Sequence, residues 1–247
     1  MTNIIPYIRS SVFYIGYGLI TLVWGTLSVI VGWALPYKIR FIFIVFVWSH
    51  LVLKWLKLSC GITYEISGKE HLSIGPCVLL VNHQSTWETL FTQTLVCPQT
   101  TLIKKELLKI PFFGWAFALL KPIAIDRKRK MGALKQLLRQ GNERLDKGIW
   151  VTLFPEGSRS SSRRGSFQRG GAALAVSAQK PVLVIAHNAG NFWPASNWLK
   201  TPGTIQVRIS SPIESKNKTV DEINAISETW LEKVLVSLDE TQVNSSL

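Results

Sequence analysis

The feature that most constrains this chain is its N-terminal segment, where residues 1–60 contain no acidic side chain. Within this segment, the run 11–36 carries no charge and is rich in aliphatic and aromatic residues. At 1.5 Å of rise per residue, a helix of this length crosses a hydrocarbon core of roughly 30 Å. The run is longer than the apolar part of a signal peptide, and no small-residue cleavage site follows it. We therefore expect a membrane-anchoring helix.

A second apolar run covers 41–53 and contains Ser49 and His50. On length it suits an interfacial or re-entrant helix better than a full span. Basic residues flank both runs and draw both ends of the predicted hairpin toward an acidic, cytoplasmic-type surface: Arg9, Lys38, Arg40, Lys54 and Lys57. We interpret 1–58 as a membrane-anchoring helical hairpin. The alternative, a hairpin buried in a globular protein, needs a partner surface that a domain of this size hardly provides.

Beyond this hairpin the sequence changes to short β-branched runs that alternate with helical segments. Several of the predicted strands are apolar on both faces, as in sheets that helices cover on both sides: 62–66, 77–81, 123–125, 149–154, 182–186 and 205–209. The predicted helices are 86–95, 131–146, 167–179 and 220–238. This alternation predicts an α/β domain over 59–247, with a largely parallel β-sheet flanked by helices.

The charge of the chain is strongly positive, with 28 Lys and Arg against 15 Asp and Glu and a net charge of +13. Such an excess indicates an anionic partner, which is nucleic acid, acidic lipid or a phosphorylated substrate. The cysteines Cys60, Cys77 and Cys97 lie far apart without a CxxC pair, so neither a disulfide framework nor a zinc site is predicted. No HExxH, Walker A or GxGxxG motif is present, and we expect no metal and no cofactor.

The first chemical motif follows the predicted strand 77–81 and pairs an imidazole, His83, with a carboxylate five residues later, Glu88. Five positions along an α-helix place two side chains about 140° apart. The pair meets if His83 ends the strand and Glu88 lies in the first turns of the next helix, capped by Ser85 or Thr86. Glu88 would then hold one ring nitrogen and leave the other as a base for a substrate hydroxyl. Taken alone, a histidine after a strand is more often structural.

The second motif, at 154–159, follows the predicted strand that ends at Phe154. α/β sheets bind ligands outside the carboxyl ends of their strands. Gly157 permits a tight turn, and Arg159 offers a planar set of donors that suits a phosphate or carboxylate. Taken alone, the motif is slightly better explained as an ordinary turn with a solvated arginine.

In this order and behind this N-terminus, the motifs resemble those of the glycerolipid acyltransferase family, most closely the 1-acyl-sn-glycerol-3-phosphate acyltransferases. The resemblance covers about 60–215. His83 and Glu88 correspond to the family's His-x4-Asp, with glutamate in place of aspartate. Glutamate keeps the charge and adds one methylene, so we expect it to orient His83 from a helix that begins slightly farther away.

Three more blocks carry the resemblance. A basic residue followed by a proline, a glycine and a terminal Asp-Arg corresponds to Lys105, 111–115 and 126–127. The family's Phe-Pro-Glu-Gly-Thr-Arg corresponds to 154–159, with Ser158 in the threonine position. A proline before a short apolar strand corresponds to 180–184.

The resemblance implies that His83, oriented by Glu88, removes the proton from the sn-2 hydroxyl of lysophosphatidic acid. That oxygen attacks the thioester of acyl-CoA or acyl carrier protein and gives phosphatidic acid, without a covalent acyl-enzyme. The resemblance also implies the substrate-binding residues, with Lys105 and Arg159 on the phosphate: Lys105, Arg127, Glu156, Gly157, Ser158 and Arg159. Backbone amides near Gly157 are expected to face the developing oxyanion.

Other function classes fit the sequence less well. The basic residues at 127–130 and 163–169 suit nucleic acid, but such a protein has no need of the uncharged hairpin. Beside a membrane, the same charges are attracted to anionic lipid. A serine hydrolase is disfavoured because no GxSxG motif occurs. His71 and His187 lack metal-ligand spacing, and we interpret them as structural.

We therefore expect a membrane-bound acyltransferase, in a cell inner membrane or its equivalent, with its catalytic domain on the cytoplasmic side. The alternatives are an acyltransferase for another lysophospholipid or lyso-aminolipid, and a basic, membrane-anchored binding protein without catalysis.

Overall fold

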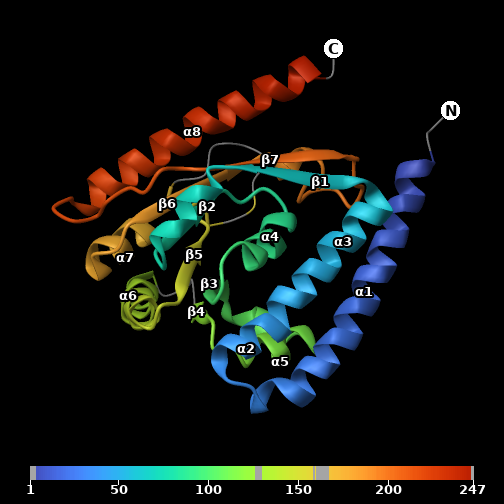
Figure 1. Ribbon diagram of the computed structural model, residues 1–247, viewed down its shortest axis with the longest axis horizontal. Helices are drawn as coiled ribbons and strands as arrows, with labels where there is room; N and C mark the ends of the chain where they lie inside the picture. Colours follow the sequence, from blue (N-terminus) through green and yellow to red (C-terminus); the bar gives the residue numbers. More distant parts are fainter. Residues whose placement is uncertain (1–3, 126–129, 158, 160–166, 246–247) are drawn as a thin grey trace.

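Figure 1 shows the computed structural model of the chain, which describes residues 4–125, 130–157, 159 and 167–245. Within these residues, seven strands form one sheet in the order β1-β7-β6-β2-β5-β3-β4. Their bounds are β1 Ile62–Ser67, β2 Val78–Val81, β3 Gln99–Lys104, β4 Ile123–Ile125, β5 Trp150–Leu153, β6 Val182–His187 and β7 Gly203–Ile209. Neighbouring strands are parallel except for β6 and β7. The predicted largely parallel sheet, flanked by helices, is confirmed.

Helices cover both faces of the sheet because its central strands are apolar on both sides. On β2, Val78 and Leu80 belong to one core cluster, and Leu79 and Val81 belong to the other. Against the first pair pack α6 (Lys130–Asp146), α7 (Gly170–Ala178) and α8 (Val220–Ser245). The cluster of the second pair also contains residues of α1 (Ile5–Val31), α3 (Trp48–Cys60) and α4 (Trp87–Leu95). In Figure 1, α8 and α1 lie on opposite sides of the molecule.

The N-terminal hairpin consists of two long helical segments. The first is α1 with a short 3-10 turn, η1 (Gly32–Ala34). The second runs without a break through α2 (Tyr37–Phe41), the π-helical stretch η2 (Ile42–Val47) and α3. This segment covers 24 residues and is longer than the apolar run 41–53 from which a second helix was predicted. It is longer because the helix continues through the basic residues that flank that run. By length and composition, both segments can cross a bilayer, which indicates a membrane protein.

The hairpin is packed along the α/β domain and does not project from it. Phe13 of α1 and Val52 of α3 are fully buried in the core cluster that includes the sheet. Lys200, which is 1% exposed, ties α1 to the segment after β6: its Nζ lies 2.7 Å from the hydroxyl of Tyr14 and 4.8 Å from the ring centroid of Trp193. The outward face of α1 is lined with exposed aliphatic side chains. One face of the hairpin therefore belongs to the core, and the other is apolar and exposed.

The sequence did not predict β3 or the short helix α5 (Phe113–Ala118). β3 lies between β5 and β4, and α5 packs against α1 at the closed end of the hairpin. The remaining elements are short 3-10 turns: η3 (Lys69–Ile74), η4 (Lys105–Lys109) and η5 (Ala189–Asn191).

Candidate active site

The site lies where the adjacent strands β6, β2 and β5 end at the same edge of the sheet. Asn82 and His83 directly follow β2, and the turn from Phe154 to Gly157 directly follows β5. His187 is the last residue of β6. Because parallel strands end at one edge, motifs far apart in the sequence meet there, as the predicted strands required.

His83 and Glu88 form a hydrogen-bonded pair. Nδ1 of His83 donates to Oε1 of Glu88 at 2.7 Å, which leaves Nε2 as the nitrogen with a lone pair. Glu88 lies in the first turn of α4, and Trp87 begins that helix, so the strand-to-helix arrangement predicted for the pair is the one observed. The Glu88 side chain is 0% exposed and the His83 side chain 15% exposed. The acid is thus shielded from water while the base reaches the surface of the site.

Local hydrogen bonds at the start of α4 fix the Glu88 carboxylate. Its Oε1 also accepts a bond from the backbone N–H of Ser85 at 2.9 Å. The Ser85 hydroxyl accepts a bond from the N–H of Trp87 at 3.1 Å, whereas Thr86 makes no side-chain cap. Of the two predicted capping residues, Ser85 is therefore the one whose side chain caps the helix. The helix N-terminus also favours the negative charge of the carboxylate.

The His83 ring and backbone are held by the motif after β5. The ring stacks on Phe154, with 4.3 Å between centroids. The backbone N–H of His83 donates to Oε1 of Glu156 at 3.3 Å. The pKa of Glu156 is raised from 4.5 to about 7, mainly by burial; the hydrogen bond from the His83 N–H lowers this pKa, and the nearby Glu88 charge raises it. Two carboxyl groups therefore hold His83, one through its ring and one through its backbone.

A cavity of about 480 Å³ opens at His83 and extends between the sheet and the hairpin. Its walls are mostly apolar, with Tyr17, Val45 and Trp48 contributed by the hairpin. Leu90 of α4 and Phe113 and Phe117 of α5 complete much of the apolar lining. This volume lies in the range of pockets that bind small organic ligands, and its lining suits an alkyl chain.

Comparison with known proteins shows the family to which the chain belongs. The family model described as Acyltransferase matches residues 63–188. The chain belongs to the acyltransferase family. It is 45% identical, over 95% of its length and 93% of the relative's, to the 1-acyl-sn-glycerol-3-phosphate acyltransferase of Pseudomonas aeruginosa. The human 1-acyl-sn-glycerol-3-phosphate acyltransferase alpha is 32% identical over 72% of this chain and 65% of its own. The resemblance seen in the motifs is confirmed, and the chain is an enzyme.

The fold of the acyltransferase is shared with a solved structure. The crystal structure of the 1-acyl-sn-glycerophosphate acyltransferase of Thermotoga maritima superposes with a TM-score of 0.78 at 21% identity. The match covers 97% of this chain and 98% of that one, so it includes the hairpin as well as the sheet.

Of the other predicted site residues, some line the cavity and others do not. Arg159 is exposed and lines the cavity together with His83 and Gly157. Lys105 is exposed in η4, and it is the preceding residue, Lys104, that lines the cavity. Arg127 and Ser158 lie outside the described residues.

Gly157 shapes the turn after β5. Its φ of +72° lies in the left-handed region that glycine adopts without strain. Its N–H donates to the carbonyl of Phe154 at 3.0 Å, so this amide closes the turn. The expectation that amides near Gly157 face the oxyanion stays a prediction.

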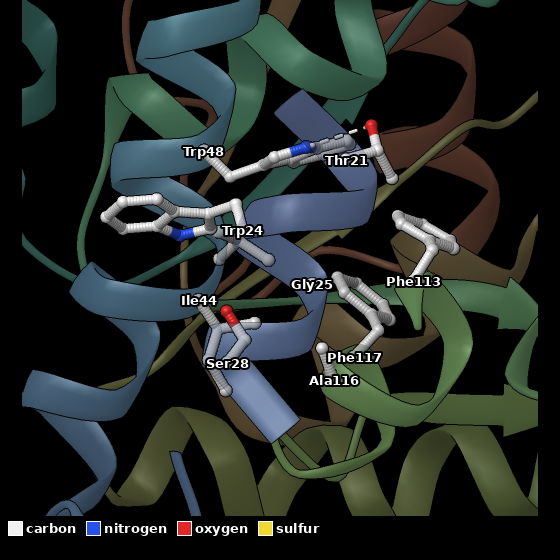
Figure 2. Close-up of a pocket in the computed structure, with 10 residues that line it drawn as sticks. Thr21, Trp24, Gly25, Ser28, Ile44, Trp48, Phe113, Ala116 and Phe117 are labelled. Carbon is white, nitrogen blue, oxygen red and sulfur yellow. Dashed lines mark hydrogen bonds between the residues drawn. The ribbon is translucent and has the colours of Figure 1, made fainter. Parts of the chain in front are cut away.

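Sequence reasoning did not find the residues that close the far end of the cavity. A second, smaller cavity lies between α1, η2 and α5, and its lining residues are drawn in Figure 2. Its volume is about 20 Å³. Val45, Trp48, Phe113 and Phe117 line both cavities, and Trp48 is fixed by a 3.2 Å hydrogen bond from its Nε1 to the Thr21 hydroxyl. These residues lie in helices, and in the sequence they cannot be distinguished from other apolar residues of a membrane helix or a core.

Proposed function

We propose that the enzyme transfers an acyl chain from acyl-CoA or acyl carrier protein to the sn-2 hydroxyl of lysophosphatidic acid, giving phosphatidic acid. The observation that carries this proposal is the His83–Glu88 pair, which lies at one cavity with Arg159 and a mostly apolar lining. A base, a phosphate-binding cation and an alkyl-chain chamber are what acylation of an anionic lysolipid requires. The relatives named above add support through their own activity.

In the proposed reaction, Nε2 of His83 accepts the proton of the sn-2 hydroxyl as that oxygen attacks the thioester carbonyl carbon. The carbon–sulfur bond then breaks, and His83 returns the proton to the leaving sulfur. Glu88 stabilises the imidazolium formed between these steps through the bond to Nδ1. General-base help is typically worth about 10²–10⁴ in rate, so positioning of both substrates supplies much of the rest. No cofactor or metal takes part in these steps.

The substrate-binding roles follow from the arrangement at the cavity. Arg159 is proposed to bind the lysolipid phosphate, since its guanidinium donates to two oxygens at once. Lys105 is proposed to join it from η4, and Arg127 and Ser158 are retained on the motif alone. Glu156 and Gly157 shape the acceptor side through the His83 backbone bond and the tight turn. The apolar cavity is proposed to receive an acyl chain.

We further propose that 1–58 anchors the enzyme and that 59–247 is the catalytic domain, on the cytoplasmic side. The exposed aliphatic face of α1 supports lipid contact, and the excess of Lys and Arg supports attraction to anionic lipid. A nucleic-acid partner is not part of the proposal. Carbonate and high salt are expected to leave the protein in membranes, and detergent is expected to release it. Release by salt alone would contradict a buried anchor.

An acceptor panel tests the proposed function. Purified full-length enzyme in vesicles is given labelled acyl-CoA or acyl carrier protein, with lysophosphatidic acid or zwitterionic lysolipids as acceptor. We expect the anionic acceptor to give a kcat/KM at least about tenfold higher, because only it places a phosphate monoester at Arg159. The His83→Ala variant supplies the blank. Equal use of a zwitterionic lysolipid would move the enzyme to another acceptor, and unchanged turnover by His83→Ala would remove the proposed base.

A further inference from the structure

A second histidine, His187, lies beside the catalytic pair at the end of β6. Its side chain is 0% exposed, and it packs edge-on against Trp87, with 5.8 Å between ring centroids. We expected it to be structural, and it is indeed buried and hydrogen-bonded. His187 contacts two residues that adjoin the proposed base, His83. Asn82 precedes His83 in the sequence, and Glu88 is hydrogen-bonded to its ring.

The hydrogen bonds of the His187 ring define its protonation state. Nε2 lies 2.9 Å from the carbonyl oxygen of Asn82, which only accepts, so Nε2 carries the proton. Nδ1 accepts the backbone N–H of Ala189 at 3.2 Å. Burial lowers the pKa of His187 from 6.5, against the opposing effect of the Glu88 charge. His187 is therefore a neutral imidazole with a fixed Nε2–H.

His187 and Asn82 join the ends of β6 and β2 by three hydrogen bonds of 2.9 Å. One is the ring bond from His187 to the Asn82 carbonyl. In the other two, the Asn82 amide donates to the His187 carbonyl, and its oxygen accepts the His187 N–H. The residue after Asn82 is His83. The peptide that carries the base is thus fixed by His187 on one side and by Glu156 on the other.

Glu88 has one oxygen that its known partners do not use. Oε1 is bonded to His83 and Ser85, whereas Oε2 is buried and has no hydrogen-bond partner among the described residues. Nε2 of His187 lies 3.9 Å from Oε2. This separation is too long for a hydrogen bond, but between two fully buried side chains the positive end of an N–H dipole stabilises a carboxylate at that range.

We propose that His187 is a positioning residue for acyl transfer, which fixes the peptide between Asn82 and His83 and stabilises the buried Glu88 carboxylate. The inference rests on the proposed function, because His187 acts through His83 and does not line the substrate cavity. Its loss should therefore slow the chemical step and leave substrate binding intact.

The test compares three variants of the full-length enzyme in vesicles. His187→Leu removes the donor, and His187→Gln keeps an amide N–H at the position of Nε2. Ser210→Ala is the matched control, since the buried Ser210 hydroxyl accepts a hydrogen bond from Val184 on the same strand, β6, at 2.9 Å. For each variant, kcat, both KM values and the thermal midpoint are measured.

We expect His187→Leu to lower kcat roughly 10- to 100-fold, as loss of a residue that orients a catalytic group typically does, with both KM values within about threefold of wild type. His187→Gln should recover most of the loss, and Ser210→Ala should lower the thermal midpoint without this loss of kcat. A kcat loss no larger in His187→Leu than in Ser210→Ala would overturn the inference. So would equal losses in the Leu and Gln variants.

Two further outcomes have defined meanings. If His187→Leu does not fold, His187→Asn replaces it, because the shorter amide reaches the position of Nδ1 but not that of Nε2. The kcat of His187→Asn should then be lower than that of His187→Gln. Equal kcat values would overturn the inference. Wild-type enzyme that transfers acyl chains to some other acceptor would refute the proposed function, while the comparison of variants on that acceptor would still decide the role of His187.

Discussion

The Glu156 side chain makes the stability of the enzyme depend on pH in a way that its burial predicts. The pKa of this carboxyl rises from 4.5 to about 7, first because of burial and then because of the nearby Glu88 charge. Since the folded-state pKa is the higher one, the folded protein keeps the proton over a range where the unfolded chain has lost it. The stabilising contribution is therefore fully present below about pH 4.5 and is lost as the pH rises through about 7.

The size of this contribution follows from the shift. A shift of one pKa unit corresponds to 1.36 kcal/mol, so the full shift corresponds to about 3 kcal/mol. Partial exposure of the Glu156 side chain lowers this contribution to about 2 kcal/mol. In Glu156→Gln the titration is absent. Between pH 4.5 and pH 8, the wild type should lose about 2 kcal/mol relative to the variant, or roughly 4–8 °C in thermal midpoint for a chain of this size.

The assay is thermal unfolding in detergent at three pH values across this range, with Glu232→Gln, at an exposed position on α8, as the control for an amide substitution. The difference in thermal midpoint between wild type and Glu156→Gln should change with pH, whereas the difference between wild type and the control should stay constant. Parallel curves for wild type and Glu156→Gln would refute the reasoning that links burial of this carboxyl to stability.

Three other predictions test the site and the hairpin. Glu88→Gln should lower kcat by about 10²–10⁴ in the acceptor assay, because an amide disturbs the tautomer of His83; near-normal turnover would contradict this. Gly16→Ala should lower the thermal midpoint, since its Cβ would lie 2.1 Å from the Trp55 indole, whereas Gly18→Ala, with nothing within 4 Å, should not; equal effects would argue against the observed α1–α3 packing. Trp48→Ala should join the two cavities and favour longer acyl donors in competition assays, and an unchanged preference would count against an acyl chain there.

The sequence predicted the sheet where its strands are apolar and failed where a strand is polar. In β3, Gln99 and Thr101 are buried although they are polar, because side-chain hydrogen bonds satisfy them. Gln99 is bonded to Thr152 of β5 and to the Thr92 carbonyl, and the Gln93 amide donates to the Thr101 hydroxyl at 3.1 Å. Such a strand has no apolar pattern in the sequence. Its polar side chains can be buried only because their hydrogen-bond partners come from other elements of the fold.

At the site, the sequence predicted the pairing of His83 with Glu88 but not the surroundings of the pair. The pairing follows from local geometry at the start of one helix, so a short stretch of sequence is enough to predict it. His187 is 99 or more residues away from both members and meets them only because β6 lies next to β2. The cavity walls from the hairpin depend in the same way on tertiary packing, which no local pattern contains.

The most direct test of the account is the turnover of His83→Gln with lysophosphatidic acid and acyl-CoA, measured beside the affinity of the variant for lysophosphatidic acid. A base that acts directly on the acceptor hydroxyl predicts a kcat lowered by about 10²–10⁴ with the lysolipid dissociation constant nearly unchanged. Turnover within about tenfold of wild type would contradict the central role given to this imidazole.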